Sequence, residues 1–306
     1  MNNGKVDWSG NFTAVVTPFT ESGDIDNGKF VENLELLMSE GIDGLVVSGC
    51  TGEAWALDGD ERVRLFRLAV ETAKGRVPVI AGTGGIMTAK VVALSLAAKD
   101  VGVNGIMVLP PYYAMIKENE VLIHYKAVSD EAKTPILLYN IPRRTGINLT
   151  PEFCQELADV DYIVAIKESS NDFVQVEETL HAVGDRMTVF TGHSAERGMA
   201  AVLLGCPGFV SSMETQVMGA EAISLYRLSA DGDLDAARRV QMRTLALDKA
   251  MRGMGTFPAN LKAAMNILGR PGGYVRPPLL NFTEQQLAQV RATLGALEIT
   301  VTQHAA

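Results

Sequence analysis

Residues 162–167 read YIVAIK, an apolar run without polar alternation that ends in a lysine. A strand that is apolar on both sides of its pleat is typical of a parallel sheet, because both faces of such a sheet are buried. Seven similar runs occur along the chain, each bounded by glycine, proline or polar residues. The eight predicted strands are residues 13–17, 45–48, 77–81, 105–109, 136–139, 162–167, 188–191 and 209–211.

Helical patterns lie between the predicted strands. In residues 28–39, Phe30, Leu34 and Leu37 recur at helical spacing, and residues 60–72 and 88–98 are similar. Strands then recur about every 30 residues, which is the length of one strand and one crossover helix. Eight such units close most simply into a (β/α)₈ TIM barrel, an α/β fold. An open doubly wound sheet is the alternative, but the glycine-rich fingerprint expected after its first strand is absent here.

The chain beyond the eighth predicted strand is expected to be helical throughout. Helical patterns occupy residues 220–230, 234–249, 258–268 and 283–297, and no further strand pattern occurs. This stretch is too long for the last helix of a barrel. We therefore predict a barrel over residues 1–214 and a C-terminal helical extension over residues 215–306. We expect the extension to pack on the barrel and to offer a surface for oligomer formation.

The charge balance and the apolar pattern exclude several classes of protein. The 306 residues include 27 Lys and Arg against 36 Asp and Glu, a net charge of −9, so no basic patch for nucleic acid is expected. The longest apolar run, residues 199–204, is far shorter than the about 20 residues that span a bilayer. Cys50, Cys154 and Cys206 have neither disulfide nor metal-ligand spacing. We predict a cytoplasmic protein without a metal site.

The chemistry of a barrel of this kind is expected at the carboxyl ends of its strands. Lys167 ends the sixth predicted strand, where apolar walls would lower the pKa of its ammonium and make it a nucleophilic amine. The structural alternative is an ion pair between Lys167 and Glu168. Tyr139 ends the neighbouring strand and favours the catalytic interpretation, because a phenol beside a Schiff base can shuttle protons.

Two further loops are candidate parts of a site. Residues 49–53 form a predicted turn between a strand and a helix. The backbone N–H groups of this turn could face a carboxylate or a phosphate. The alternative is that its glycines serve only the geometry of a tight turn. Tyr112 and Tyr113 follow two prolines, and an aromatic interface patch is the alternative there.

Three motifs in order along the chain resemble the dihydrodipicolinate synthase / N-acetylneuraminate lyase family of class I aldolases. They are Gly49-x-Thr51-Gly52-Glu53, Tyr139-Asn140-x-Pro142-x-Arg144-Thr145-Gly146 and Ile166-Lys167-Glu168. The pair Tyr112-Tyr113 and the tail segments Gly272-Gly273 and Arg276-Pro277-Pro278-Leu279 are similar as well. The resemblance covers nearly the whole chain.

The resemblance implies a mechanism and a set of roles. Lys167 would form a Schiff base with pyruvate or another 2-keto acid, and Tyr139 would be the general acid and base. Thr51, with Gly49 and the nearby backbone N–H groups, would hold the pyruvate carboxylate. No organic cofactor is implied, because the lysine itself provides the electron sink.

The resemblance also implies a pocket and an assembly. Gly192 and Val210 would line the pyruvate pocket at the ends of the last two strands. Tyr113 would enter the site of a neighbouring subunit as part of a proton relay that includes Cys50. The family commonly forms a homotetramer from two tight dimers, so we expect the same of this chain.

Two residues bear on the identity of the second substrate, and they favour different reactions. Arg144 matches the arginine with which the synthases of the family bind the carboxylate of aspartate semialdehyde, which favours the synthase reaction of lysine biosynthesis over the sugar lyase. Cys50 stands where the synthases usually carry threonine, and a thiol is a poorer hydrogen-bonding partner. The alternative is an aldolase or dehydratase for a 2-keto-3-deoxy sugar acid. A non-catalytic keto-acid-binding protein is a third possibility, but it would have no use for Lys167, Tyr139 and Thr51 together.

Feedback inhibition by lysine is not expected. The lysine-inhibited synthases carry polar or acidic residues at the positions that Gly59, Ile86 and Lys90 occupy here. The Lys90 ammonium would repel the ammonium groups of lysine.

Overall fold

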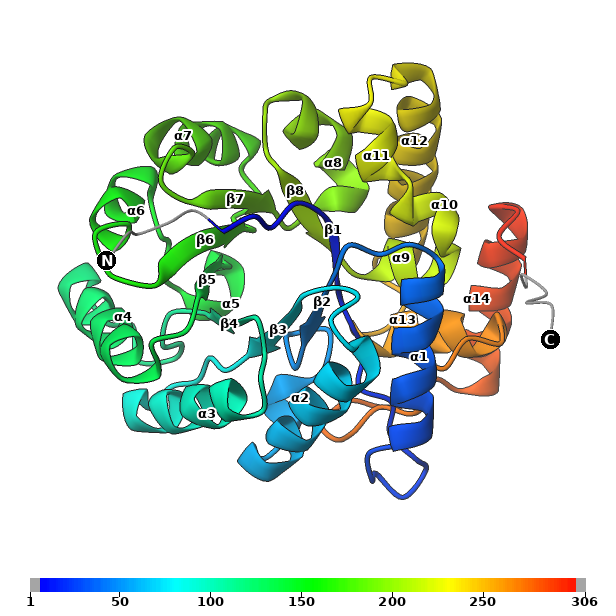
Figure 1. Cartoon of the computed structure of the whole chain (residues 1–306). Coiled ribbons are helices and arrows are strands. Elements are labelled where there is room, and N and C mark those ends of the chain that lie inside the picture. The colour runs from blue at the N-terminus through cyan, green and yellow to red at the C-terminus, as the bar shows by residue number, and fades with distance from the viewer. Residues whose placement is uncertain (1–5, 301–306) are drawn as a thin grey trace.

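Eight parallel strands close into a barrel in the computed structural model, which describes residues 6–300. Each strand pairs with the next along the chain, and the last pairs with the first (Figure 1). The predicted (β/α)₈ TIM barrel is therefore confirmed. The strands are β1 (Gly10–Ala14), β2 (Gly44–Val47), β3 (Val79–Gly82), β4 (Gly105–Val108), β5 (Ile136–Asn140), β6 (Ile163–Glu168), β7 (Thr188–Thr191) and β8 (Gly208–Ser211).

Helices surround the barrel on its outer side, and those between consecutive strands form the ring seen in Figure 1. These are α1 (Asn27–Ser39), α2 (Gly59–Ala73), α3 (Thr88–Asp100), α4 (Glu118–Ala132), α6 (Pro151–Leu157), α7 (Phe173–Val183) and α8 (Ser194–Leu203). Two short elements precede α2 and α6, namely the 3₁₀ helix η1 (Ala54–Ala56) and the single turn α5 (Pro142–Thr145).

All residues of the eight strands are buried, because side chains on both faces of the sheet have apolar partners. One set of side chains fills the barrel interior, among them Phe12, Ile80 and Phe190. The other set, which includes Leu45 and Ile166, packs against the ring of helices. This double burial explains why the strands lack polar alternation in the sequence.

Two of the predicted strands are displaced in the structure. The first begins at Gly10 rather than residue 13 and ends at Ala14 rather than residue 17. The prediction was wrong because Gly10 and Asn11 do not look like strand residues, yet both pair with β8. Gly10 lies so close to Asp43 that a Cβ atom would come within 2.5 Å of that side chain. The third strand begins at Val79 rather than residue 77, after Pro78.

The chain after β8 is helical, as predicted. It forms α9 (Met213–Met218), α10 (Ala220–Ile223), α11 (Leu225–Ala230), α12 (Leu234–Met251), α13 (Ala259–Ile267) and α14 (Glu284–Ala296). The later helices share an apolar core of their own that includes Leu247, Met265 and Val290. Thr215 and Gln216 hydrogen-bond to β1 and the segment after it, so α9 is tied to the barrel. The boundary at residue 214 stays a prediction, and residues 301–306 of the predicted extension lie outside the described residues.

Candidate active site

Lys167 lies at the carboxyl end of β6 with its side chain 6% exposed. Its strand neighbours are Tyr139 on β5 and Phe190 on β7. The Lys167 Nζ atom lies 4.4 Å from the centre of the Tyr139 ring. Burial lowers the pKa of Lys167 to about 8, against an opposing effect of Cys50 and Glu214. A substantial fraction of the side chain is therefore a neutral amine near pH 8, the form that attacks a carbonyl carbon.

Glu168 is not the partner of Lys167, although it is the next residue. Its carboxylate accepts hydrogen bonds from Asn140 Nδ2 at 2.6 Å, from Gln175 Nε2 at 3.0 Å and from the Ser170 N–H at 2.5 Å. Successive side chains of a strand point to opposite faces. The Glu168 side chain therefore lies toward α7, and the structural alternative of a Lys167–Glu168 ion pair is wrong.

Tyr139 is buried beside Lys167, and the Cys50 thiol lies next to its phenol. Burial raises the pKa of the Tyr139 phenol well above its usual value, and Cys50 adds to the effect. The phenol therefore keeps its proton until a stronger base forms nearby. A group in this state can donate a proton to a developing alkoxide and take it back in the reverse step.

A cavity of about 560 Å³ opens at the carboxyl ends of the strands and includes Lys167 and Tyr139. Its size lies within the range of about 300–1,000 Å³ that is usual for small-molecule sites. Five more of the predicted site residues line it, and these are Cys50, Thr51, Arg144, Gly192 and Val210. Gly192 admits no side chain, because a Cβ atom there would lie 3.0 Å from Lys167 Cε and 1.8 Å from Ser169 Oγ. A larger residue at this position would block the approach to the lysine.

Gly49 and Arg144 lie at a second cavity of about 360 Å³ on the other side of Tyr139. Arg144 lines both cavities, and its guanidinium lies 5.7 Å from the centre of the Trp55 ring. Tyr113 lines neither cavity and is 88% exposed, with its backbone in the left-handed region at φ 72°. The single chain therefore brings together all the predicted site residues except Tyr113, which points to solvent.

The sequence analysis missed Glu214, which lines the cavity at the start of α9. Its carboxylate accepts hydrogen bonds from Ser194 Oγ and, at 3.3 Å, from the Ser212 N–H. Burial raises the pKa of this carboxyl. A signal was available, because Glu214 closely follows the last apolar strand and a charged residue at that place faces the mouth of a barrel.

Arg143, His193 and Ser194 also line the cavity without having been predicted as site residues. Arg143 stands beside Arg144, and Arg197 and Arg252 line the cavity as well, so four guanidinium groups border it. Within residues 6–300, no three His, Cys, Asp or Glu side chains gather as metal ligands would. No helix in the same range is long and apolar enough to cross a membrane.

Comparison with known proteins finds relatives over nearly the whole chain. The model of the dihydrodipicolinate synthetase family matches residues 7–297. An uncharacterized DapA-like lyase of Rhizobium meliloti is 37% identical, over 96% of this chain and 98% of that protein. The 4-hydroxy-tetrahydrodipicolinate synthase 1 of Halalkalibacterium halodurans is 36% identical, over 96% and 97%. A similar solved structure is that of YagE, a prophage protein of the dihydrodipicolinic acid synthase family from E. coli K12, in complex with pyruvate. It is 30% identical in sequence, the match covers 96% of this chain and all of that one, and the TM-score is 0.91.

Proposed function

Because this chain belongs to the dihydrodipicolinate synthetase family, and is therefore a lyase of the class I aldolase type, we propose that it condenses pyruvate with L-aspartate 4-semialdehyde. The product of this reaction is 4-hydroxy-tetrahydrodipicolinate, an intermediate of lysine biosynthesis. The observation that carries the proposal is the buried Lys167 amine beside the Tyr139 ring at the floor of the cavity. The arginines that line the cavity, Arg143 and Arg144 among them, support a second substrate that carries a carboxylate.

In the proposed reaction, the Lys167 Nζ lone pair attacks C2 of pyruvate and forms a carbinolamine. The hydroxyl group leaves as water with a proton from Tyr139, and a protonated imine remains. Thr51 and the N–H groups of its loop hold the pyruvate carboxylate. The Tyr139 phenolate left by the loss of water takes the C3 proton, and the imine nitrogen accepts the electron pair of the C3–H bond, which gives an enamine and restores the Tyr139 phenol.

The enamine carbon attacks the aldehyde carbon of the second substrate and forms the new carbon–carbon bond. Tyr139 donates a proton to the aldehyde oxygen as it becomes a hydroxyl, which is the general acid role that its high pKa suits. The amino group of the semialdehyde then attacks C2, closes the ring and releases Lys167 as an amine.

The experiment that tests the substrate is a coupled assay. Purified protein is supplied with pyruvate and L-aspartate 4-semialdehyde, together with the NADPH-dependent reductase that consumes the product. We expect saturable oxidation of NADPH. No oxidation, with pyruvate still trapped on the protein by borohydride, would reject the semialdehyde as substrate and retain the imine chemistry.

Cleavage or dehydration of a 2-keto-3-deoxy sugar acid is the second candidate function. Two observations favour it. Cys50 lies beside Tyr139 where the synthases usually carry threonine. The Ser194–Glu214 pair gives the cavity a hydroxyl and a carboxyl that suit a hydroxylated chain. Turnover of such an acid without turnover of the semialdehyde would favour this candidate.

The assembly and the location are also part of the proposal. The exposed Tyr113 supports a homotetramer of two tight dimers in which this ring enters the partner's cavity. The thiols Cys50, Cys154 and Cys206 are all free, which is compatible with a cytoplasmic protein.

Replacing Cys50 with threonine is expected to raise the rate of the semialdehyde reaction. A hydroxyl is a better donor and acceptor than a thiol and would pass protons to and from Tyr139 more readily. The measurement is kcat in the coupled assay for the wild type and for Cys50→Thr. An unchanged or lower kcat would show that the thiol suits a different substrate.

Lysine is expected to leave the activity unchanged at millimolar concentration. Lys90 is exposed on α3, and its ammonium repels the ammonium groups of lysine. Turnover is measured with and without about 5 mM lysine, a concentration that would occupy most of a site with a Kd of about 1 mM or lower. A clear reduction would contradict the prediction.

A further inference from the structure

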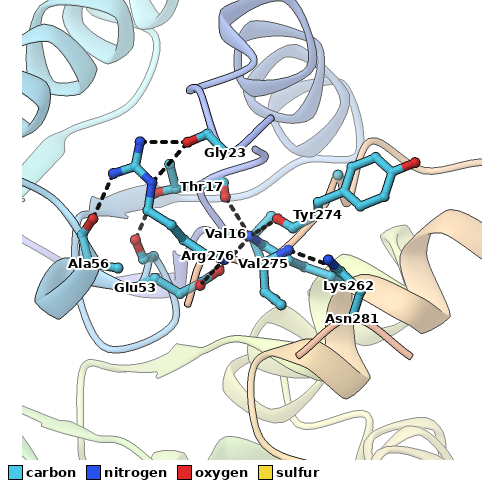
Figure 2. Close-up of polar contacts among 12 residues, drawn as sticks. Val16, Thr17, Gly23, Glu53, Ala56, Lys262, Tyr274, Val275, Arg276 and Asn281 are labelled. Atoms are coloured by element: carbon cyan, nitrogen blue, oxygen red, sulfur yellow. Dashed lines mark hydrogen bonds and ion pairs between the residues drawn. The ribbon is translucent and has the colours of Figure 1, made fainter. Parts of the chain in front are cut away.

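Lys262 is buried at the join between the C-terminal helices and the barrel. It belongs to α13, is 1% exposed, and donates hydrogen bonds to three oxygens (Figure 2). These are the Thr17 carbonyl at 2.6 Å, the Tyr274 carbonyl at 2.6 Å and Glu53 Oε1 at 2.5 Å. Three acceptors match the three N–H groups of an ammonium. Burial lowers the pKa of Lys262 to about 8, against the opposing effect of Glu53, so the side chain is mainly a cation at neutral pH.

Glu53 is the last residue of the 49–53 turn and is fully buried. Its backbone is in the left-handed region at φ 53°, which a residue with a side chain adopts only when its surroundings hold it there. The second carboxylate oxygen accepts a hydrogen bond from the Arg276 N–H at 3.2 Å. The carboxylate is therefore held by two segments of the C-terminal region, as Figure 2 shows.

The segment that these contacts hold includes Thr51, the residue proposed to bind the pyruvate carboxylate. Thr51 lies two residues before Glu53, and Gly52 between them is pressed against the barrel, since a Cβ atom there would lie 3.1 Å from the Val15 carbonyl oxygen. The Gly52 carbonyl accepts a hydrogen bond from Thr17 Oγ1 at 2.8 Å. The Thr17 hydroxyl thus holds the turn, while the Thr17 carbonyl accepts a hydrogen bond from Lys262.

We propose that Lys262 is a positioning residue of the active site, which holds the 51–53 turn in the shape that binds the carboxylate of the 2-keto acid. The inference rests on the proposed function, because it places that carboxylate at Thr51. The C-terminal helical region is then part of the substrate site, although its residues lie more than 200 positions along the chain from the turn. A buried ion pair that only stabilised the fold would leave pyruvate binding unchanged in any variant that folds.

The test uses borohydride trapping of pyruvate on the protein, with the pyruvate concentration for half-maximal trapping as the measured quantity. Lys262→Met keeps the length of the side chain and removes the charge. Because a small displacement of a binding group costs up to about 100-fold, we expect this concentration to rise by about 10-fold to 100-fold. We expect the trapping rate at saturating pyruvate to change by less than about threefold, since the lost interaction concerns binding.

A second variant separates positioning from stability. Lys262→Met leaves the Glu53 carboxylate buried without its cation, which lowers the melting temperature. Adding Glu53→Gln removes that charge, so the double variant should regain much of the melting temperature. The pyruvate concentration for its half-maximal trapping should stay raised, because the turn still lacks the Lys262–Glu53 contact with α13. Recovery of both quantities together would overturn the proposal.

The control is Arg243→Met, which breaks the half-exposed ion pair with Glu221 in the same C-terminal region, away from the cavity. Its pyruvate requirement should equal that of the wild type. If Lys262→Met also behaves as the wild type, the positioning role alone is refuted. If the wild type itself traps no pyruvate, the proposed function fails and this inference fails with it.

Discussion

The Lys167→Ala variant is expected to lose turnover almost completely and to form no borohydride-stable adduct with pyruvate. The amine is the proposed nucleophile and electron sink, and no other described lysine lines the cavity. Removal of a covalent nucleophile in other enzymes costs about 10⁶-fold in kcat, so a loss of about 10⁵-fold or more is expected here. The measurements are kcat in the coupled assay and the amount of pyruvate bound after reduction.

The matched control for this variant is Lys99→Ala, which removes an exposed lysine from α3. It should retain the turnover and the adduct of the wild type. An adduct that survives in Lys167→Ala would show that another lysine is the nucleophile, and the assignment of the site would be wrong.

The Tyr139→Phe variant is expected to fold normally and to turn over about 10²-fold to 10⁴-fold more slowly, which is the usual contribution of one general acid or base. The phenyl ring fills the same space in the barrel interior, so the loss reflects the missing phenol. The imine with pyruvate should still form slowly, because Lys167 is intact. The measurement is kcat beside the time course of borohydride trapping.

A second buried tyrosine provides the control. Tyr125 is fully buried on α4 and donates a hydrogen bond to the Val108 carbonyl at 3.2 Å, outside the cavity. Tyr125→Phe should therefore keep the turnover of the wild type. A kcat for Tyr139→Phe within a few-fold of the wild type would remove Tyr139 from the proton-transfer role.

Much of the fold was predictable because its strands are buried on both faces. The runs without polar alternation identified eight strands, and the spacing between them indicated the crossover helices. The ends of strands were less predictable where proline and glycine interrupt the pattern. The first strand was misplaced because Gly10 and Asn11 owe their strand conformation to pairing with β8, a contact that no local pattern reveals.

The residues of the site also differ in how far the sequence predicts them. Lys167 and Tyr139 could be found because each ends an apolar run and the two strands are neighbours. The Lys262–Glu53 pair could not, because it joins an apolar helix to a turn far away in the sequence. Tyr113 differs again, since the single chain leaves it in solvent and its predicted role needs a second subunit.

The proposed mechanism requires that pyruvate becomes covalently bound to Lys167. The most direct test is to treat the protein with pyruvate and borohydride, digest it, and locate the modified lysine by peptide mass spectrometry. We predict one modified site, on the peptide that contains Lys167, and its loss when pyruvate is omitted. Modification of a different lysine, or none at saturating pyruvate, would contradict the account.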